Sequence, residues 1–239
     1  MTRWLLKTVA ADGAAHGGFV WPLEVGAEVT APDWSDAIEC GGGLHGLLDG
    51  RGNGPLLSWS PGAVWLVAEV PADARLVDLV GKVKVDRCVV AHVGDRLSAT
   101  GFLAEQGQVD GVVGAHVVAG DGGTATAGDG GAATAGDYGT ATAGDGGAAT
   151  AGYRGTATAG YGGTATAGDY GTVTAGERGT ATAGYGGTAT AGDYGTIVLA
   201  WWDDKLVRRR WVVGEVGIDG IKADTPYRCE DGRLVEVES

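Results

Sequence analysis

An eight-residue phrase, Ala-Gly-x-x-Gly-Thr-Ala-Thr, recurs ten times between Ala119 and Thr196, with some substitutions but no change of register. A fixed short period is typical of a solenoid, in which repeats form coils and the coils stack. Segments of low complexity are often disordered. Here threonine favours strands, and the glycines recur at fixed offsets where a turn needs them. The repeat therefore predicts a β-solenoid over residues 108–198.

The order of residues within one repeat predicts which side chains face outward. Side chains alternate between the two faces of a strand. The two threonines in the stretch from Gly123 to Ala127 therefore share one face, and the glycine and alanines share the other. Only the small residues fill a narrow interior without voids, so the threonines should point outward. Eight residues provide one short strand and one turn, which is half a coil. We therefore expect about five coils of sixteen residues.

Coils of this size sort the repeats into two sheets. Odd-numbered repeats carry Thr-x-Thr throughout, whereas even-numbered repeats read Ala-Ala-Thr twice, Thr-Ala-Thr twice and finally Thr-Ile-Val. Rungs lie about 4.8 Å apart, and side chains two residues apart on a strand lie about 6.7 Å apart. The odd repeats thus predict a flat grid of hydroxyl and methyl groups that can hold water in a regular array. The residues of this predicted water- or ice-binding face are Thr124, Thr126, Thr140, Thr142, Thr156, Thr158, Thr172, Thr174, Thr188 and Thr190.

The phrase resembles the octapeptide repeat of bacterial ice nucleation proteins, commonly Ala-Gly-Tyr-Gly-Ser-Thr-x-Thr, over about a third of the chain. The resemblance implies a β-solenoid whose Thr-x-Thr rows order water into an ice-like layer. Glycine replaces the usual serine at the fifth place, and aspartate often replaces the tyrosine at the third. Five coils are few for an ice nucleus, so we expect ordering of water or adsorption to existing ice. The tyrosines stand at two different places of the unit, so we expect no unbroken tyrosine ladder. They are Tyr138, Tyr153, Tyr161, Tyr170, Tyr185 and Tyr194.

A regular threonine face also has a simpler explanation, because threonine suits any outward strand position and keeps the face soluble. The alternative function is a structural or interaction scaffold whose N-terminal domain binds a protein partner. Interaction surfaces usually display aromatic residues and arginine. In this repeat those residues occur at the turns, so a protein partner or a second copy would bind along a turn edge.

The segments on either side of the repeat differ from it in composition. Five of the eight tryptophans precede the repeat, three follow it and none lies inside. Apolar runs at Arg3–Val9, Ala63–Val70 and Gly81–Val93 predict a mostly β N-terminal domain over residues 1–107, with a short helix from Ser98 to Gln106. Asp110–Val118 is expected to be an imperfect first strand that closes one end of the stack. Residues 199–239 predict a β cap at the other end, because a terminal coil exposes apolar surface and unpaired backbone. The chain is therefore predicted to be all-β.

The N-terminal segment contains one chemically suggestive motif, Cys40-Gly-Gly-Gly-Leu-His45. With Val25-Gly26 before it and Lys82 after it, the order resembles a small bacterial and phage domain of unknown function, found joined to such repeats. That resemblance implies no activity. A cysteine and a histidine within hydrogen-bond reach can form a nucleophile and base, but no orienting residue is identifiable.

Cys88 and His92 would complete a Cys₂His₂ set with Cys40 and His45. Residues four apart on a strand are about 13 Å apart, which is too far for one tetrahedral ion. The Gly41–Gly43 run lacks the strand and helix context of a phosphate-binding loop. We therefore expect no enzyme, no metal ion and no cofactor.

Charge and cysteine content limit the partners and the compartment. The net charge of −13 disfavours nucleic acid as a partner. Three cysteines are too few for a disulfide framework, and neither a signal peptide nor a membrane span is recognisable. These features predict a cytoplasmic protein with no membrane partner.

Overall fold

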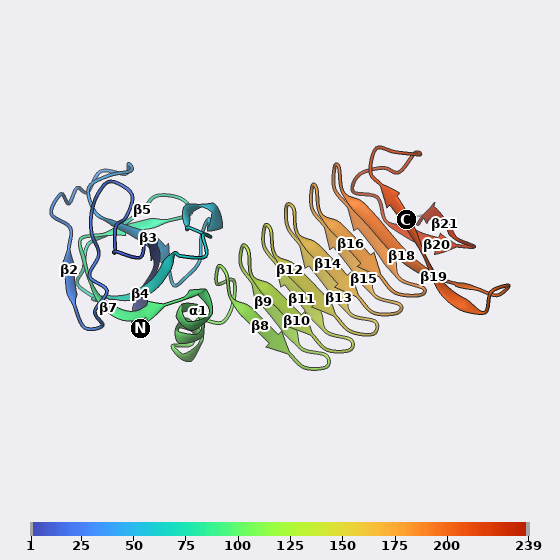
Figure 1. The fold of residues 1–239 in the computed structure, drawn as a ribbon, viewed down its shortest axis with the longest axis horizontal. Coiled ribbons are helices and arrows are strands. Elements are labelled where there is room, and N and C mark those ends of the chain that lie inside the picture. The colour runs from blue at the N-terminus through green and yellow to red at the C-terminus, as the bar shows by residue number, and fades with distance from the viewer. Residues whose placement is uncertain (1, 238–239) are drawn as a thin grey trace. The chain divides into compact units, whose positions relative to one another are not determined.

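A computed structural model describes residues 2–237, which form two compact units, one ending at Ala115 and the other beginning at His116. Strands predominate in both units (Figure 1). Among the described residues, no helix is long and apolar enough to cross a membrane.

The N-terminal unit is built on a seven-stranded sheet in which every pairing between strands is antiparallel. Leu5, Leu66 and Val85 are fully buried in its core. The predicted strand Arg3–Val9 is confirmed. The predicted run Gly81–Val93 is split at Asp86, whose carboxylate accepts hydrogen bonds from the backbone and side chain of Arg75. In sheet order the strands are β2 (Glu28–Thr30), β7 (Arg87–Gly94), β4 (Val64–Val70), β1 (Arg3–Val9), β3 (Leu44–Leu48), β6 (Val83–Val85) and β5 (Leu76–Asp78).

One α-helix, α1 (Arg96–Glu105), packs against β4 and β7, and a 3₁₀ turn, η1 (Gly54–Leu56), lies elsewhere in the unit. The predicted helix is confirmed, but it begins at Arg96, two residues before the predicted start at Ser98. Asp95 is the N-cap: its carboxylate accepts the Ser98 backbone N–H at 2.8 Å, and the Ser98 hydroxyl accepts the Asp95 N–H at 3.0 Å. This reciprocal capping box satisfies two backbone donors at the first turn and lowers the pKa of Asp95.

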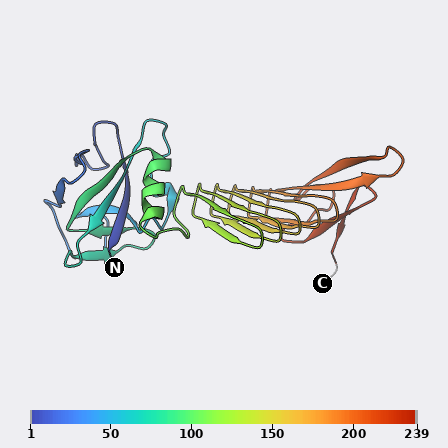
Figure 2. The same ribbon diagram turned by 90° about the horizontal axis from the view of Figure 1, so that it is seen from below.

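The repeat forms two parallel sheets whose strands alternate along the chain, as expected for coils of sixteen residues. Up to the last coil, each strand pairs with the strand sixteen residues further on, without a shift of register. We call one sheet the Thr sheet: β9 (Thr124–Ala127), β11 (Thr140–Ala143), β13 (Thr156–Ala159), β15 (Thr172–Ala175) and β17 (Thr188–Ala191). We call the other the mixed sheet: β8 (His116–Ala119), β10 (Ala132–Ala135), β12 (Ala148–Ala151), β14 (Thr164–Ala167), β16 (Thr180–Ala183) and β18 (Thr196–Asp203). Figure 2 shows the coils as a flattened stack.

The first strand of the solenoid begins at His116, so the predicted strand from Asp110 is wrong over its first six residues. Val112 and Val113 are fully buried within the N-terminal unit, where the Val113 N–H donates to the Gly50 carbonyl at 2.9 Å. Their apolar side chains are used by that core rather than as the end of the stack.

The interior of the solenoid is made almost entirely of alanine. From Ala125 onward, the alanines at the seventh and first places of the repeat, such as Ala157 and Ala159, are at most 5% exposed, and Val173 replaces one of them without exposure. The glycine at the fifth place keeps the coil narrow. At Gly171 a Cβ atom would lie 2.5 Å from the Ala167 Cβ and 3.0 Å from the Gly155 carbonyl oxygen, closer than atoms can pack.

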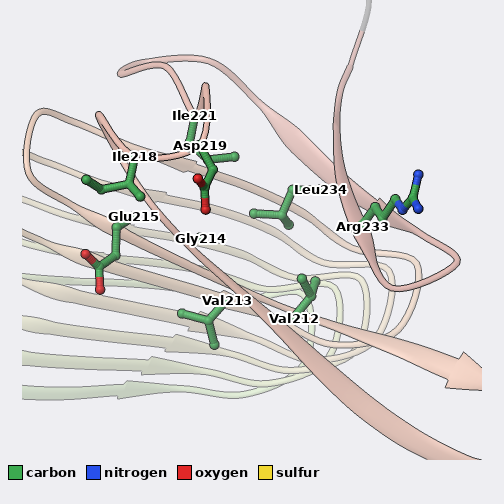
Figure 3. A pocket seen from close by; sticks show the side chains of 9 residues that line it. All are labelled: Val212, Val213, Gly214, Glu215, Ile218, Asp219, Ile221, Arg233 and Leu234. Carbon is green, nitrogen blue, oxygen red and sulfur yellow. The ribbon is translucent and has the colours of Figure 1, made fainter.

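The far end of the solenoid is covered by a β cap. The strand β18 extends beyond the repeat length and pairs antiparallel with β19 (Arg208–Glu215), while β20 (Tyr227–Glu230) pairs with β17 and with β21 (Arg233–Glu236). Tyr227 is buried in the solenoid core, and Val212, Ile221 and Leu234 pack against that core. These last three side chains also line a hollow of about 630 Å³ between β19 and β21 (Figure 3). The cap thereby covers the apolar end of the last coil.

Candidate functional site: the threonine face

All ten threonines predicted for the candidate site lie on the outer face of the Thr sheet. Thr124, Thr140, Thr156, Thr172 and Thr188 align as one in-register column. The second threonine of each strand forms a parallel column. Every one of these side chains is exposed or half-buried, whereas the residue between each pair is fully buried. The result is five rungs of two threonines each.

The mixed sheet has the same backbone arrangement but a less regular outer face. Its first rung carries His116 and Val118, the next two begin with Ala132 and Ala148, and the last ends with Val198. Two consecutive rungs, those of β14 and β16, carry the complete Thr-Ala-Thr pattern. The parity of the repeats therefore separates a complete threonine face from an incomplete one, as the sequence predicts.

Tight turns hold the coils in register. Within each turn the fifth residue donates its backbone N–H to the carbonyl of the second, as in Gly155 to Gly152 at 3.1 Å. The fourth residue has a positive φ, which glycine adopts freely and other residues adopt at a cost of about 1–2 kcal/mol. Five of these ten positions are glycine, and the others are Tyr138, Arg154, Tyr170, Arg178 and Tyr194.

Aspartates at the third place of the repeat link one coil to the next. The Asp121 carboxylate accepts the backbone N–H of Asp137 at 2.9 Å, and the Asp137 carboxylate accepts that of Tyr153 at 2.7 Å. The glycine at the second place makes room for this contact, because a Cβ at Gly136 would collide with the Asp121 carboxylate. These bonds fix the spacing between coils at the edges of both sheets.

A continuous tyrosine ladder runs along the turn edge that leads from the mixed sheet to the Thr sheet. Tyr138, Tyr153, Tyr170 and Tyr185 stack edge to face in successive coils, with ring centroids 5.7, 5.8 and 5.8 Å apart. The expectation of no unbroken ladder is therefore wrong. The rings alternate between the fourth and third places of the repeat, but adjacent turns bring these two places together. Each ring is thus within contact distance of the next, and Arg154 lies over two of them.

The opposite turn edge has no comparable column. Its first two turns carry Asp-Gly, and the next three carry Tyr161, Arg178 and Tyr194. Arg178 lies over both tyrosine rings and donates a hydrogen bond to the Tyr161 hydroxyl at 2.9 Å. The two edges of the solenoid therefore differ, as its two sheets do.

The cysteines and histidines considered as catalytic or metal ligands have other surroundings. Cys40 is exposed, while Cys88 lies in the core of the N-terminal unit, where burial raises the pKa of its thiol to about 12. His92 stacks on Phe102 of α1 and lies within hydrogen-bond distance of the Ser98 hydroxyl. His45 lies on β3. Within residues 2–237, no three His, Cys, Asp or Glu side chains are grouped so that they could hold a metal ion.

The Thr face offers a chemistry that is unlike an active site. Its ten side chains carry one hydroxyl and one methyl group each, and none is charged. Hydroxyl groups both donate and accept hydrogen bonds, so a regular row of them can bind a regular row of waters. The methyl groups between the hydroxyls neither donate nor accept hydrogen bonds, so they do not compete for nearby water. What the face can offer chemically is therefore a regular set of hydrogen-bonding positions for water.

Comparison with known proteins shows a similarity to ice nucleation proteins over about half of this chain. It is 36% identical to ice nucleation protein InaU of Pantoea ananas over 119 residues, 49% of this chain and 11% of that protein. An ice nucleation protein of Pseudomonas syringae is 39% identical over 101 residues, 42% of this chain and 9% of its own length. One from Xanthomonas campestris pv. translucens is 45% identical over 100 residues, 41% of this chain and 6% of its own. No family model and no solved structure matches the chain.

Proposed function

We propose that the Thr sheet orders water and adsorbs to ice. The β-solenoid and its ice nucleation protein-like octapeptide repeats support this proposal. The observation that carries the proposal is the in-register column of five Thr-x-Thr rungs on one face. Stacked strands repeat at about 4.8 Å and threonines on one strand lie about 6.7 Å apart, so the face presents hydroxyls on a fixed rectangular grid. Waters bound to such a grid are held in an array before they meet ice.

The size of the face favours adsorption over nucleation. Five rungs span about 19 Å from the first to the last, at the usual spacing between strands. The relatives named ice nucleation protein are much longer, since this chain spans 11% and 9% of the first two described above. A face of this size can bind to an existing crystal plane but organises few waters on its own.

In this proposal the protein is not an enzyme. It acts in the cytoplasm, where its three free cysteines would stay reduced. Ice or ordered water is its partner. The alternative is a scaffold whose N-terminal unit binds a protein partner. The tyrosine ladder favours one version of that alternative, in which a second copy binds along the edge formed by Tyr138, Tyr153, Tyr170 and Tyr185.

The direct test is ice-affinity partitioning of the purified chain, combined with thermal hysteresis and ice shaping at millimolar concentration. We expect the protein to be enriched in slowly grown ice and to facet a single crystal, while an acidic globular protein of similar size is excluded. Exclusion from ice together with round, unshaped crystals would refute ice adsorption and leave the scaffold function as the better account.

A further inference from the structure

The N-terminal unit contains two adjoining hollows that the threonine face does not explain. The larger, of about 470 Å³, and the smaller, of about 190 Å³, share Lys7, His16 and His45 as lining residues. Lys82 completes the wall of the smaller hollow. We call the site formed by Lys7, His16, His45 and Lys82 the basic pocket.

The basic pocket concentrates positive charge in a chain whose net charge is −13. The strand pairings bring three of the five lysines to this region, with Lys84 directly opposite His45 in the ladder between β3 and β6. Within residues 2–237, neither Lys7 nor Lys82 forms an ion pair. One acidic residue, Asp33, is among the residues that line the larger hollow, and none lines the smaller. The lysines are therefore not neutralised by the protein itself.

His45 is poised between these lysines with an unused nitrogen. Its Nε2 atom is buried without a hydrogen-bond partner among the described residues. Burial, followed by the charges of Lys82 and Lys7, lowers the pKa of His45, and burial followed by the charge of Lys82 lowers that of Lys7. Both groups thus hold their protons less firmly than usual, and a bound anion would reverse this effect.

The remaining walls of the pocket are preformed. Lys84 is fully buried, and its ammonium group donates to the carbonyls of Glu39 and Gly41 at 3.2 and 3.1 Å. These bonds hold the glycine run beside the larger hollow. Apolar side chains, Phe19 and Trp21 among them, line the larger hollow, and Leu47, Leu56 and Leu57 line the smaller. Pockets with apolar walls and a few convergent polar groups are typical of small-molecule sites.

We propose that the basic pocket binds a small phosphate monoester, with its phosphate in the smaller hollow between Lys7, Lys82 and His45. The organic part of the ligand would lie in the larger hollow, against Phe19 and Trp21. A phosphate dianion matches two ammonium groups and accepts a hydrogen bond from His45, whereas a single carboxylate carries half that charge. The site does not use a helix N-terminus, so it differs from a phosphate-binding loop.

Calorimetric titration of the full chain with phenyl phosphate, inorganic phosphate and benzoate tests the proposal. We expect phenyl phosphate to bind at least about tenfold more tightly than benzoate, with inorganic phosphate weaker than phenyl phosphate. Lys7→Met and Lys82→Met should each weaken phenyl phosphate binding by about tenfold or more. Lys205→Met, which removes an exposed lysine from the C-terminal cap, is the matched control and should bind as the unchanged chain does.

A second measurement does not depend on the folding of the variants. Proton NMR of the four histidine rings in the unchanged chain should show the His45 signal moving on addition of phenyl phosphate, and its pKa rising. The signals of His92 and His116 should stay in place. Absence of binding at about 10 mM phenyl phosphate, equal affinity for benzoate, or a His45 signal that does not move would each overturn the proposal.

Discussion

The two sheets of the solenoid have the same backbone arrangement but present different side chains to solvent. Every outward position in the strands of the Thr sheet is threonine, ten of ten, while the mixed sheet has threonine at seven of twelve and alanine, valine or histidine at the others. The mixed sheet keeps the same register through these substitutions. Outward threonine is therefore not required for the strand. Its complete use on one sheet needs a reason other than strand stability.

The two turn edges allow a similar comparison. Non-glycine residues in the left-handed conformation cost about 1–2 kcal/mol each. On the tyrosine-ladder edge that cost is offset by edge-to-face ring contacts, each worth about 0.5–1.5 kcal/mol. The opposite edge has glycine in that conformation at three of its five turns, and Arg178 and Tyr194 at the others are in cation–π contact. The complete threonine face on one sheet and the tyrosine ladder on one edge therefore both go beyond what formation of the coil requires.

The greatest loss of stability should come from a substitution that disrupts both sheets together. Gly171→Ala places a methyl group 2.5 Å from the Ala167 Cβ inside the coil and should destabilise the solenoid by about 3 kcal/mol, since an overpacked core must distort. Gly120→Ala is the matched control, because a Cβ there meets no atom within 4 Å and φ is not positive. Its cost should stay within about 0.5 kcal/mol. Urea unfolding measures both variants, and equal losses would contradict the packing described for the core.

A smaller effect separates the two edges. Tyr153→Ala removes two ring contacts and an arginine partner, so it should cost about 1–2 kcal/mol. Tyr161→Ala removes contacts to Arg178 alone and should cost about 0.5 kcal/mol. Thermal unfolding of the two variants side by side checks the difference. If Tyr161→Ala cost as much as Tyr153→Ala, the ladder would contribute nothing as a unit.

Completing the mixed sheet should bring the two sheets closer in function with little change in stability. Ala132→Thr combined with Ala148→Thr fills two outward positions and extends the complete Thr-x-Thr rungs of β14 and β16 to four. We expect a modest gain in ice adsorption, up to about twofold if both sheets then bind, and a stability change within about 0.5 kcal/mol. Thermal hysteresis measures the gain. An unchanged value in a protein that adsorbs to ice would show that four rungs on this sheet do not suffice.

The smallest effect concerns pH. Backbone hydrogen bonds, the Leu206 N–H first, and Arg210 lower the pKa of Asp203 in the cap. A folded pKa below the unfolded one stabilises the fold above the usual aspartate value, and this stabilisation is lost as pH falls through the folded pKa. Asp203→Asn should flatten the acid side of the stability profile, as followed by denaturant midpoints from pH 7 to pH 3. Ice adsorption by the uncharged Thr face should not change over pH values at which the protein stays folded.

The sequence predicts the solenoid well because its period directly encodes the coil. The alternation of Thr and Ala determines which side chains face outward, and the parity of the repeats determines which share a sheet. Comparison of positions within one unit does not reveal the tyrosine ladder, because Tyr138 and Tyr153 occupy different places of the repeat and meet across neighbouring coils. Val112 and Val113 have the same apolar character in either unit, so their composition does not reveal which core buries them.

The basic pocket has no sequence signal of this kind. Lys7, His45 and Lys82 come from three distant segments, which the pairings of β1 with β3 and of β3 with β6 bring near one another. His45 and Lys82 belong to the suggestive motif of the N-terminal segment, but nothing in that motif indicates that they lie beside Lys7. Long-range antiparallel pairing, rather than local pattern, creates that site.

A matched pair of substitutions on opposite sheets tests directly whether the Thr sheet is the surface that adsorbs to ice. Thr156→Lys and Thr164→Lys each place a long charged side chain at an exposed position near the middle of the stack, on the Thr sheet and the mixed sheet respectively. Both variants should fold, as checked by circular dichroism and thermal unfolding, because both side chains point outward. Ice-affinity partitioning and thermal hysteresis should be nearly abolished by Thr156→Lys and retained by Thr164→Lys. Equal retention or equal loss in two folded variants would contradict the assignment of ice adsorption to the Thr sheet.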